Sequence, residues 1–155
     1  MATVRSGVRR ETSITGPLLI IGDLDIVVGD YNRLSYVENI GNVTGPEFVW
    51  FPPGQKGDPF DGMTFGEEMN PFLLDLDGDG DLDLAAGDKT GAIRYYENVG
   101  SVLLAQFVAR KRTSNPFNKA KVKSYCAPSF VDLDADGYLD LVVGEAAAEG
   151  EATGG

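Results

Sequence analysis

Five aspartates alternate with other residues over nine positions near the middle of the chain, and a second stretch repeats the arrangement. Residues 75–83 read DLDGDGDLD and residues 132–140 read DLDADGYLD, so both follow the pattern DxDxDGxxD. Calcium takes about six to eight oxygen ligands at about 2.3–2.6 Å, and alternate carboxylates on a tight loop can converge on such an ion. The spacing therefore predicts two calcium sites.

The pattern also assigns a role to each position of the two loops. The shared glycine, Gly80 or Gly137, supplies the sharp turn, and by analogy with an EF-hand loop the residue after it offers its backbone carbonyl. A carbonyl ligand needs no particular side chain, which is why Tyr138 can stand where the first loop has Asp81. The predicted ligands are Asp75, Asp77, Asp79, Asp81 and Asp83 in the first loop, and Asp132, Asp134, Asp136, Tyr138 and Asp140 in the second.

An EF-hand, a magnesium site and a metal-free turn fit these loops less well than calcium does. An EF-hand needs a bidentate glutamate at the twelfth position, which is Ala86 in the first loop and Val143 in the second. Magnesium demands strict octahedral geometry and usually keeps several waters. A solvated acidic turn without a metal is the remaining alternative, and two copies that both retain the glycine argue against it.

Composition narrows the function further. The chain has no histidine, which removes the commonest general base and most zinc sites, so we expect no enzyme activity. A net charge of −11 disfavours nucleic acid and anionic membrane surfaces as partners. No run of about 18 apolar residues is present, so we expect no membrane insertion. The single cysteine, Cys126, is expected to be a buried structural thiol.

The elements that carry these loops recur along the chain. The segments GDLDIVVGD, GDLDLAAGD and GYLDLVVGE place Asp25, Asp83 and Asp140 at spacings of 58 and 57 residues, and YVENIG is matched by YYENVG. The predicted organisation is a ragged segment 1–15, a degenerate repeat 16–69, a complete repeat 70–126, the start of a third repeat 127–145 and a flexible tail 146–155.

Each repeat shows short stretches of alternating hydrophobicity separated by glycine-rich turns, which is typical of four antiparallel strands. Such units stack as blades, so we expect an all-β, incomplete β-propeller with two to three blades in an open arc. A fragment, a truncated product, or a protomer that completes its core by self-association are the alternatives. In the first repeat Pro17 and Asp25 are eight residues apart, whereas Pro71 and Asp83 are twelve apart, so no calcium is expected there.

These motifs resemble FG-GAP/VCBS repeats, the blade units of integrin-α-like propellers, over most of residues 16–145. The resemblance implies calcium in the loop between the first two strands of a blade. It also implies an extracellular or cell-surface protein with a structural, adhesive or ligand-binding role toward a protein or a glycan. The alternative is the non-catalytic propeller portion of a secreted polysaccharide-active enzyme. The first residues contain no apolar core of a signal peptide.

Two further groups of residues allow more than one interpretation. A basic cluster between the second and third repeats could be a nuclear-import site, an anionic-glycan site or a solvated loop face, and the acidic surroundings favour the last. An aromatic group could line a sugar-binding surface or pack between blades, and packing is the commoner use. The basic cluster consists of Arg110, Lys111, Arg112, Lys119, Lys121 and Lys123, and the aromatic group of Phe48, Trp50, Phe51, Phe60, Phe65 and Phe72.

Overall fold

The computed structural model describes residues 2–8, 22–55 and 58–146, with side chains described from residue 24 onward. These residues form strands and one short 3-10 helix, so the expected all-β class is confirmed. The elements are β1 (Ala2–Val8), β2 (Gly22–Gly29), β3 (Leu34–Asn39), β4 (Phe48–Phe51), β5 (Asn70–Leu74), β6 (Asp83–Gly87), β7 (Ile93–Asn98), β8 (Phe107–Arg110), η1 (Arg112–Ser114), β9 (Cys126–Val131) and β10 (Asp140–Glu145).

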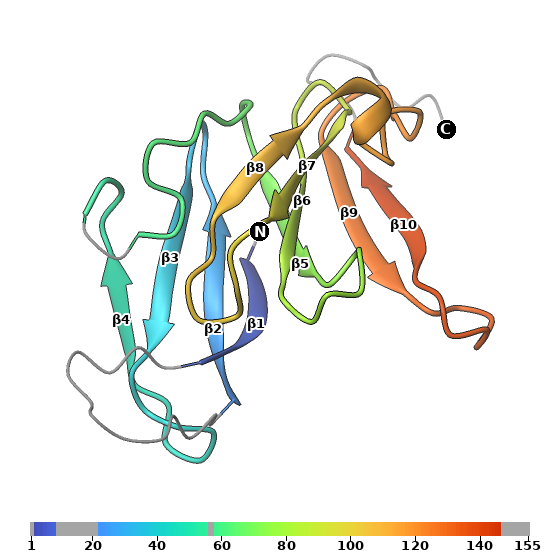
Figure 1. Cartoon of the computed structure of the whole chain (residues 1–155). Coiled ribbons are helices and arrows are strands. Elements are labelled where there is room, and N and C mark those ends of the chain that lie inside the picture. Colours follow the sequence, from blue (N-terminus) through green and yellow to red (C-terminus); the bar gives the residue numbers. More distant parts are fainter. Residues whose placement is uncertain (1, 9–21, 56–57, 147–155) are drawn as a thin grey trace, which may run out of the picture.

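The strands form three antiparallel sheets, none of which closes on itself (Figure 1). The first sheet has the order β1-β2-β3-β4, the second has β5-β6-β7-β8, and the third pairs β9 with β10. Neighbouring sheets touch through their early strands, since β5 contacts β1, β2 and β9. The chain thus forms the same hairpin succession twice and begins it a third time. No helix within the described part of the chain could cross a bilayer.

The first strand of the first sheet lies where the sequence did not place it. Its register sets Arg5 opposite Asp25, just as Leu74 lies opposite Asp83 in the second sheet. Segment 1–15, expected to be ragged, therefore contains β1, and the count from Pro17 that implied a loop four residues shorter does not describe the strand pairing. Residues 9–21, which include Pro17, lie outside the described residues. Strand pairing depends on backbone hydrogen bonds, which many sequences can supply.

The second sheet is covered on both faces, and strand β6 is buried throughout. Successive side chains of a strand point to opposite faces. Leu84 and Ala86 accordingly join the cluster between the first and second sheets, whereas Ala85 joins the cluster between the second and third. Cys126 lies in the latter cluster, and burial, with smaller contributions from Asp88 and Glu145, raises the pKa of its thiol to about 11. The buried structural thiol is confirmed.

The aromatic group divides between core and surface. Phe60 packs edge-on against Phe65 with ring centroids 6.2 Å apart, and Phe51 packs against Tyr36 at 5.8 Å. Phe48 and Trp50 on the edge strand β4 are exposed. Phe51, Phe60 and Phe65 belong to or pack against the cluster between the first and second sheets, and Phe72 packs against Phe130 of the third sheet at 5.2 Å, so packing between sheets is confirmed for these four.

Successive sheets approach most closely at two equivalent glycines. A Cβ on Gly29 would lie 1.8 Å from the Met69 carbonyl oxygen, and one on Gly87 would lie 2.2 Å from the Cys126 carbonyl oxygen. Only glycine allows such an approach. Gly144 occupies the same place in the third repeat, but a Cβ there would meet nothing closer than 3.6 Å. The first and second sheets are thus joined in the same way as the second and third.

Candidate metal centre

The two aspartate loops join the first and second strands of their sheets, β5 to β6 and β9 to β10, and lie at the lower end of the sheets in Figure 1. In each loop the first three aspartates offer carboxylate oxygens that all lie within 4.8 Å of one another. Oxygens on opposite sides of a calcium ion are about 5 Å apart, twice the usual bond length. Each group could therefore hold a metal ion. These groups are Asp75, Asp77 and Asp79, and Asp132, Asp134 and Asp136.

Backbone amides hold the carboxylates of the first loop in position. Asp75 accepts bonds from the N–H groups of Gly78 (2.8 Å) and Gly80 (3.1 Å), and Asp79 accepts one from Asp81 (3.0 Å). A carboxylate has about four lone-pair sites, so these bonds leave capacity for a metal. The loop orients its carboxylates before any cation arrives.

The second loop repeats this arrangement with different residues. Asp132 accepts a bond from the N–H of Gly137 (3.0 Å), and Asp136 accepts one from Tyr138 (2.8 Å). Tyr138 is 78% exposed, so its side chain has no part in the loop and only its backbone is used. That agrees with a position at which the side chain is free to vary, although its carbonyl as a ligand stays a prediction.

Both loops need left-handed backbone at two positions. In the first loop these are Gly78 and Gly80, with φ of +81° and +92°. In the second they are Ala135 and Gly137, with φ of +61° and +90°. Glycine adopts such angles without cost, whereas alanine is strained. Ala135 is therefore the one position of the second loop where its sequence opposes the loop conformation.

Asp83, predicted to be a ligand of the first calcium site, forms hydrogen bonds outside the loop's group of three carboxylates. Its side chain is 1% exposed and accepts bonds from the Tyr95 hydroxyl (2.8 Å), the Asn98 N–H (2.8 Å) and the Leu76 N–H (3.3 Å). Burial raises the pKa of Asp83, and the bonds from Asn98, Tyr95 and Leu76 offset part of that rise. The carboxylate lies outside the group of three, and its role as a ligand stays a prediction.

The first sheet contains the same junction without an aspartate-rich loop. Asp25 is buried and accepts bonds from the Tyr36 hydroxyl (3.0 Å) and the Asn39 N–H (2.9 Å). Asp25 and Asp83 are equivalent positions, and so are their tyrosine and asparagine partners. The aspartate at this position thus joins the second and third strands of its sheet independently of any metal, a role that sequence reasoning missed.

The same junction explains the repeated YxENxG motif. The Asn98 side-chain oxygen accepts bonds from the N–H groups of Gly100 (3.1 Å) and Gln106 (2.8 Å), which closes the hairpin between β7 and β8. A Cβ on Gly100 would lie 2.2 Å from the Leu104 carbonyl oxygen. The asparagine and the glycine of the motif are therefore required by the turn. The recurrence of YVENIG as YYENVG was the signal that could have revealed the junction.

In the third repeat this junction has fewer contacts. Asp140 is exposed and accepts one bond, from the Leu133 N–H (3.0 Å), which matches the bond from Leu76 to Asp83. No tyrosine hydroxyl within the described residues donates to it. The carboxylate of Asp140 lies outside the group of three in its own loop, as Asp83 does, and its role as a ligand also stays a prediction.

Asp81, expected to act only through its carbonyl, carries the most unusual carboxylate of the first loop. Its side chain is 6% exposed, and its Oδ1 atom has no hydrogen-bond partner among the described residues. Burial raises its pKa, and the negative charges of Asp79, Asp83, Asp77 and Asp75 raise it further. A buried oxygen without a partner, surrounded by four carboxylates, is poorly stabilised by the protein alone. A bound cation would satisfy it, so the residues present fit a metal site.

Comparison with protein families finds a match over the part of the chain that contains both aspartate loops. Residues 75–143 match the family model described as FG-GAP-like repeat, so the resemblance inferred from the motifs is confirmed over this range. The match begins at the first aspartate of the first loop and ends within β10, and it includes both loops. Searches among curated proteins and among solved structures find no match.

Proposed function

We propose, from the FG-GAP-like repeat that residues 75–143 form, that the chain is a non-enzymatic module that binds two calcium ions. The observation that carries the proposal is the buried, unpartnered Oδ1 of Asp81 inside a loop of carboxylates that already lie at metal-binding distances. Calcium would supply the positive charge that this loop lacks. Two ions would change the formal charge from −11 to −7.

The proposed ligands of each ion are of two kinds, carboxylates and backbone carbonyls. In each loop the first three aspartates are proposed to supply carboxylate oxygens, and the residue after the glycine its backbone carbonyl, by analogy with an EF-hand loop. In the first loop Asp81 adds a carboxylate that the second loop replaces with Tyr138. We therefore expect the first site to bind calcium more tightly, because an additional negative ligand strengthens binding of a hard cation.

The three sheets are proposed to be successive blades of an open β-propeller. The equivalent close contacts at Gly29 and Gly87 support this arrangement, because they join consecutive sheets in one repeated geometry. Gly144 occupies the equivalent position on the third sheet, and among the described residues no further sheet packs against it, since the nearest atoms to a Cβ there belong to Ala127 of the paired strand at 3.6 Å. A further four-stranded unit, supplied by self-association, would pack there.

The proposed setting is an extracellular or cell-surface protein in which the module serves a structural, adhesive or ligand-binding role. Support for this setting comes from the FG-GAP-like repeat. The non-catalytic propeller portion of a secreted polysaccharide-active enzyme is the second candidate. This second candidate is supported by a cleft beside strands β7 and β8 whose lining suits a saccharide. A protein or glycan ligand fits either setting.

Thermal unfolding in calcium and in a chelator tests the calcium proposal. At a free calcium concentration of about 100 times the dissociation constant, binding to the folded state stabilises it by about 2.7 kcal/mol per site. For a chain of this length each kcal/mol raises the midpoint by roughly 2–4 °C. Magnesium at the same concentration is the matched control. An unchanged midpoint on adding calcium would refute the proposal.

A further inference from the structure

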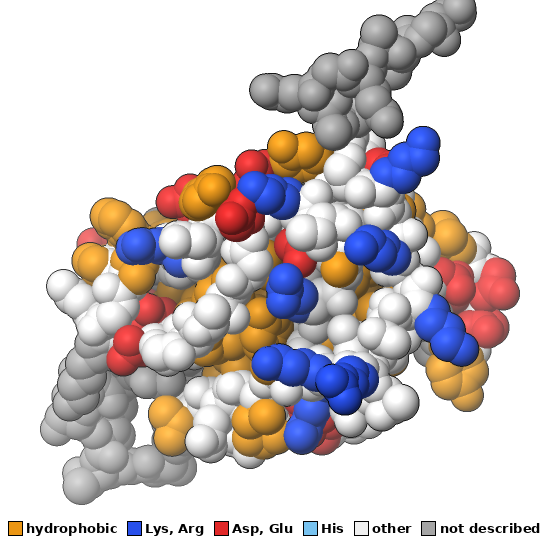
Figure 2. Space-filling view, turned by 90° about the horizontal axis from the view of Figure 1, so that it is seen from above, with side chains coloured by type: hydrophobic (Ala, Val, Ile, Leu, Met, Phe, Trp, Pro, Cys, Tyr) orange, Lys and Arg blue, Asp and Glu red, His pale blue; other side chains and the backbone are white. Residues whose placement is uncertain are grey.

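We infer that a basic cleft at the end of the sheets opposite the aspartate loops binds an acidic saccharide. The cleft has a volume of about 580 Å³ and lies between strands β7 and β8 and the two connections that lead into β5 and β9. In the view from above, Lys and Arg side chains gather around a hollow floored by hydrophobic side chains (Figure 2). Pockets of this size suit small ligands.

The location follows from the strand directions. The aspartate loops join β5 to β6 and β9 to β10, whereas the cleft is lined by the turn that joins β6 to β7 and by the connection after β8. In an antiparallel sheet these two kinds of connection lie at opposite ends of the strands. The cations that line the cleft therefore lie at the end of the sheets opposite the two aspartate loops.

Aromatic rings that brace one another form the floor of the cleft. Phe65, which is partly exposed, packs against the buried Tyr96 with centroids 5.4 Å apart. Phe107 also lines the cleft and stacks at 5.5 Å on Phe60 beneath it. Such packed rings hold a fixed apolar surface, which suits the flat C–H face of a sugar ring.

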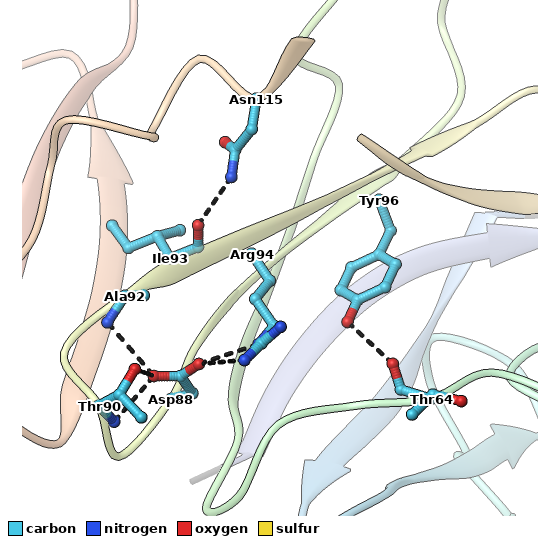
Figure 3. A network of polar contacts seen from close by, with 8 residues as sticks. All are labelled: Thr64, Asp88, Thr90, Ala92, Ile93, Arg94, Tyr96 and Asn115. Atoms are coloured by element: carbon cyan, nitrogen blue, oxygen red, sulfur yellow. Dashed lines mark hydrogen bonds and ion pairs between the residues drawn. The ribbon is translucent and has the colours of Figure 1, made fainter. Parts of the chain in front are cut away.

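Two guanidinium groups on the wall are fixed by ion pairs. Arg94 donates to the buried Asp88 through Nε (2.9 Å) and a terminal nitrogen (2.8 Å), as Figure 3 shows. Arg110 forms a bidentate pair with Glu97, in which Nε and a terminal nitrogen donate at 2.8 and 2.6 Å. The same picture shows Tyr96 donating to the Thr64 carbonyl oxygen (3.4 Å). The wall is thus built in advance of any ligand.

Three further cations on the rim have no carboxylate partner among the described residues: Lys111, Arg112 and Lys121. The described lining contains no aspartate or glutamate, although the chain as a whole carries a charge of −11. A surface that excludes carboxylates from an acidic protein and leaves three cations uncompensated favours an anionic ligand. A guanidinium group binds a carboxylate or a sulfate with matched geometry.

Arg112 adds an independent sign that the rim is shaped for binding. Its φ is +54°, in the left-handed region that an arginine rarely adopts. The carbonyls of Lys111 and Arg112 accept bonds from Ser114 (3.2 Å) and Asn115 (3.1 Å), which hold this conformation. Strained backbone of this kind persists where the surroundings enforce it, and it is common at ligand sites.

The combination selects the ligand class. The cations require a carboxylate or a sulfate, the ring faces require a flat apolar surface, and the volume admits one or two rings. A uronic acid or a sulfated sugar meets all three requirements. An extended acidic peptide meets the first requirement only.

Isothermal titration of the full chain with digalacturonic acid tests the inference, with its neutral dimethyl ester and a sulfated disaccharide as comparison probes. We expect the acid to bind and the ester to bind at least about tenfold more weakly. The variant R112Q/K121Q should weaken binding of the acidic probes by a similar factor. The matched control K119Q/K123Q makes the same charge change on the same connection but outside the cleft, and it should change affinity less than about twofold.

A calcium-site variant, D77N/D134N, separates this cleft from the aspartate loops. Unchanged saccharide affinity in that variant supports the cleft, whereas lost affinity would place the saccharide on calcium and overturn the inference. Equal binding of acid and ester, absence of binding by both acidic probes, or equally tight binding of a polyglutamate peptide would also overturn it. A failure of the calcium-dependent thermal shift would leave these outcomes unaffected.

Discussion

Replacing Gly87 with alanine should force the second and third sheets apart. The new Cβ would lie 2.2 Å from the Cys126 carbonyl oxygen and 2.8 Å from Pro128 Cδ, so β9 would have to move by about 1 Å to reach ordinary contact distance. Overpacking of this kind costs about 1–3 kcal/mol. The movement would also strain the bonds from Cys126 N–H to Asp88 (3.0 Å) and from Asn70 to the Cys126 carbonyl oxygen (3.0 Å). Each such bond contributes about 1 kcal/mol.

The expected loss of stability is therefore about 3 kcal/mol or more, which lowers the unfolding midpoint by roughly 6–12 °C for a chain of this length. Thermal and urea unfolding followed by circular dichroism would measure it. Gly144→Ala is the matched control, because its Cβ would meet nothing closer than 3.6 Å, and its effect should stay within about 0.5 kcal/mol. Equal losses in the two variants would refute the close packing of successive sheets at these glycines.

Substitutions in the loops and in the polar network give two more tests. Ala135→Gly relieves the left-handed strain in the second loop and should stabilise the chain by about 0.5–1 kcal/mol, whereas Gly78→Ala should destabilise the first loop by a similar amount, as chemical unfolding would show. Burial raises the pKa of Asp88, but bonds from Thr90 and Ala92 and the charge of Arg94 outweigh it, so the net shift is downward. Asp88 therefore contributes stability that is present above its ordinary pKa of about 3.9 and is lost as the pH falls through its lower folded value. Asp88→Asn should lose about 1–2 kcal/mol at pH 7 and show a shallower decline below about pH 4, and parallel acid-unfolding curves would contradict this.

The repeat pattern predicted much of the fold because the same physical constraints act in each copy. Gly29 recurs as Gly87 since neighbouring backbones approach at both positions, and the YxENxG motif recurs since its turn leaves no room for a Cβ on Gly41 or Gly100. Alternating hydrophobic residues predicted four antiparallel strands in the second repeat, and β5 to β8 form such a sheet. Constraints of this kind are local and can be read from one sequence.

The strand pairing of the first sheet and the burial of individual carboxylates depend on contacts that a single sequence does not specify. The pairing of β1 with β2 is made by backbone groups, and nothing in residues 2–8 marks them as the partner of β2. Asp83 and Asp75 belong to one motif, yet one carboxylate is buried against a tyrosine and the other lies exposed in the loop. The identity of the residue is the same in both cases, and both accept backbone N–H bonds, so burial and the Tyr95 hydroxyl distinguish the two roles.

The basic cluster shows how structure adds to an interpretation made from sequence. From the sequence a solvated loop face was favoured, and Lys119 and Lys123 agree with it because they are exposed and lie outside the cleft. Arg112 and Lys121 are exposed as well, and together with Arg110 they line a cleft with an aromatic floor. The cleft is assembled from β7, β8 and two connections, which no local pattern brings together.

Calcium titration by calorimetry tests the central claim most directly. The wild-type chain, first stripped with a chelator, should bind two calcium ions, and Asp77→Asn and Asp134→Asn should each bind one. The variant Asp61→Asn, which changes an exposed carboxylate outside both loops, should still bind two. Absence of heat on titrating the wild-type chain, or a stoichiometry of two that persists in both loop variants, would contradict the assignment of calcium to these loops.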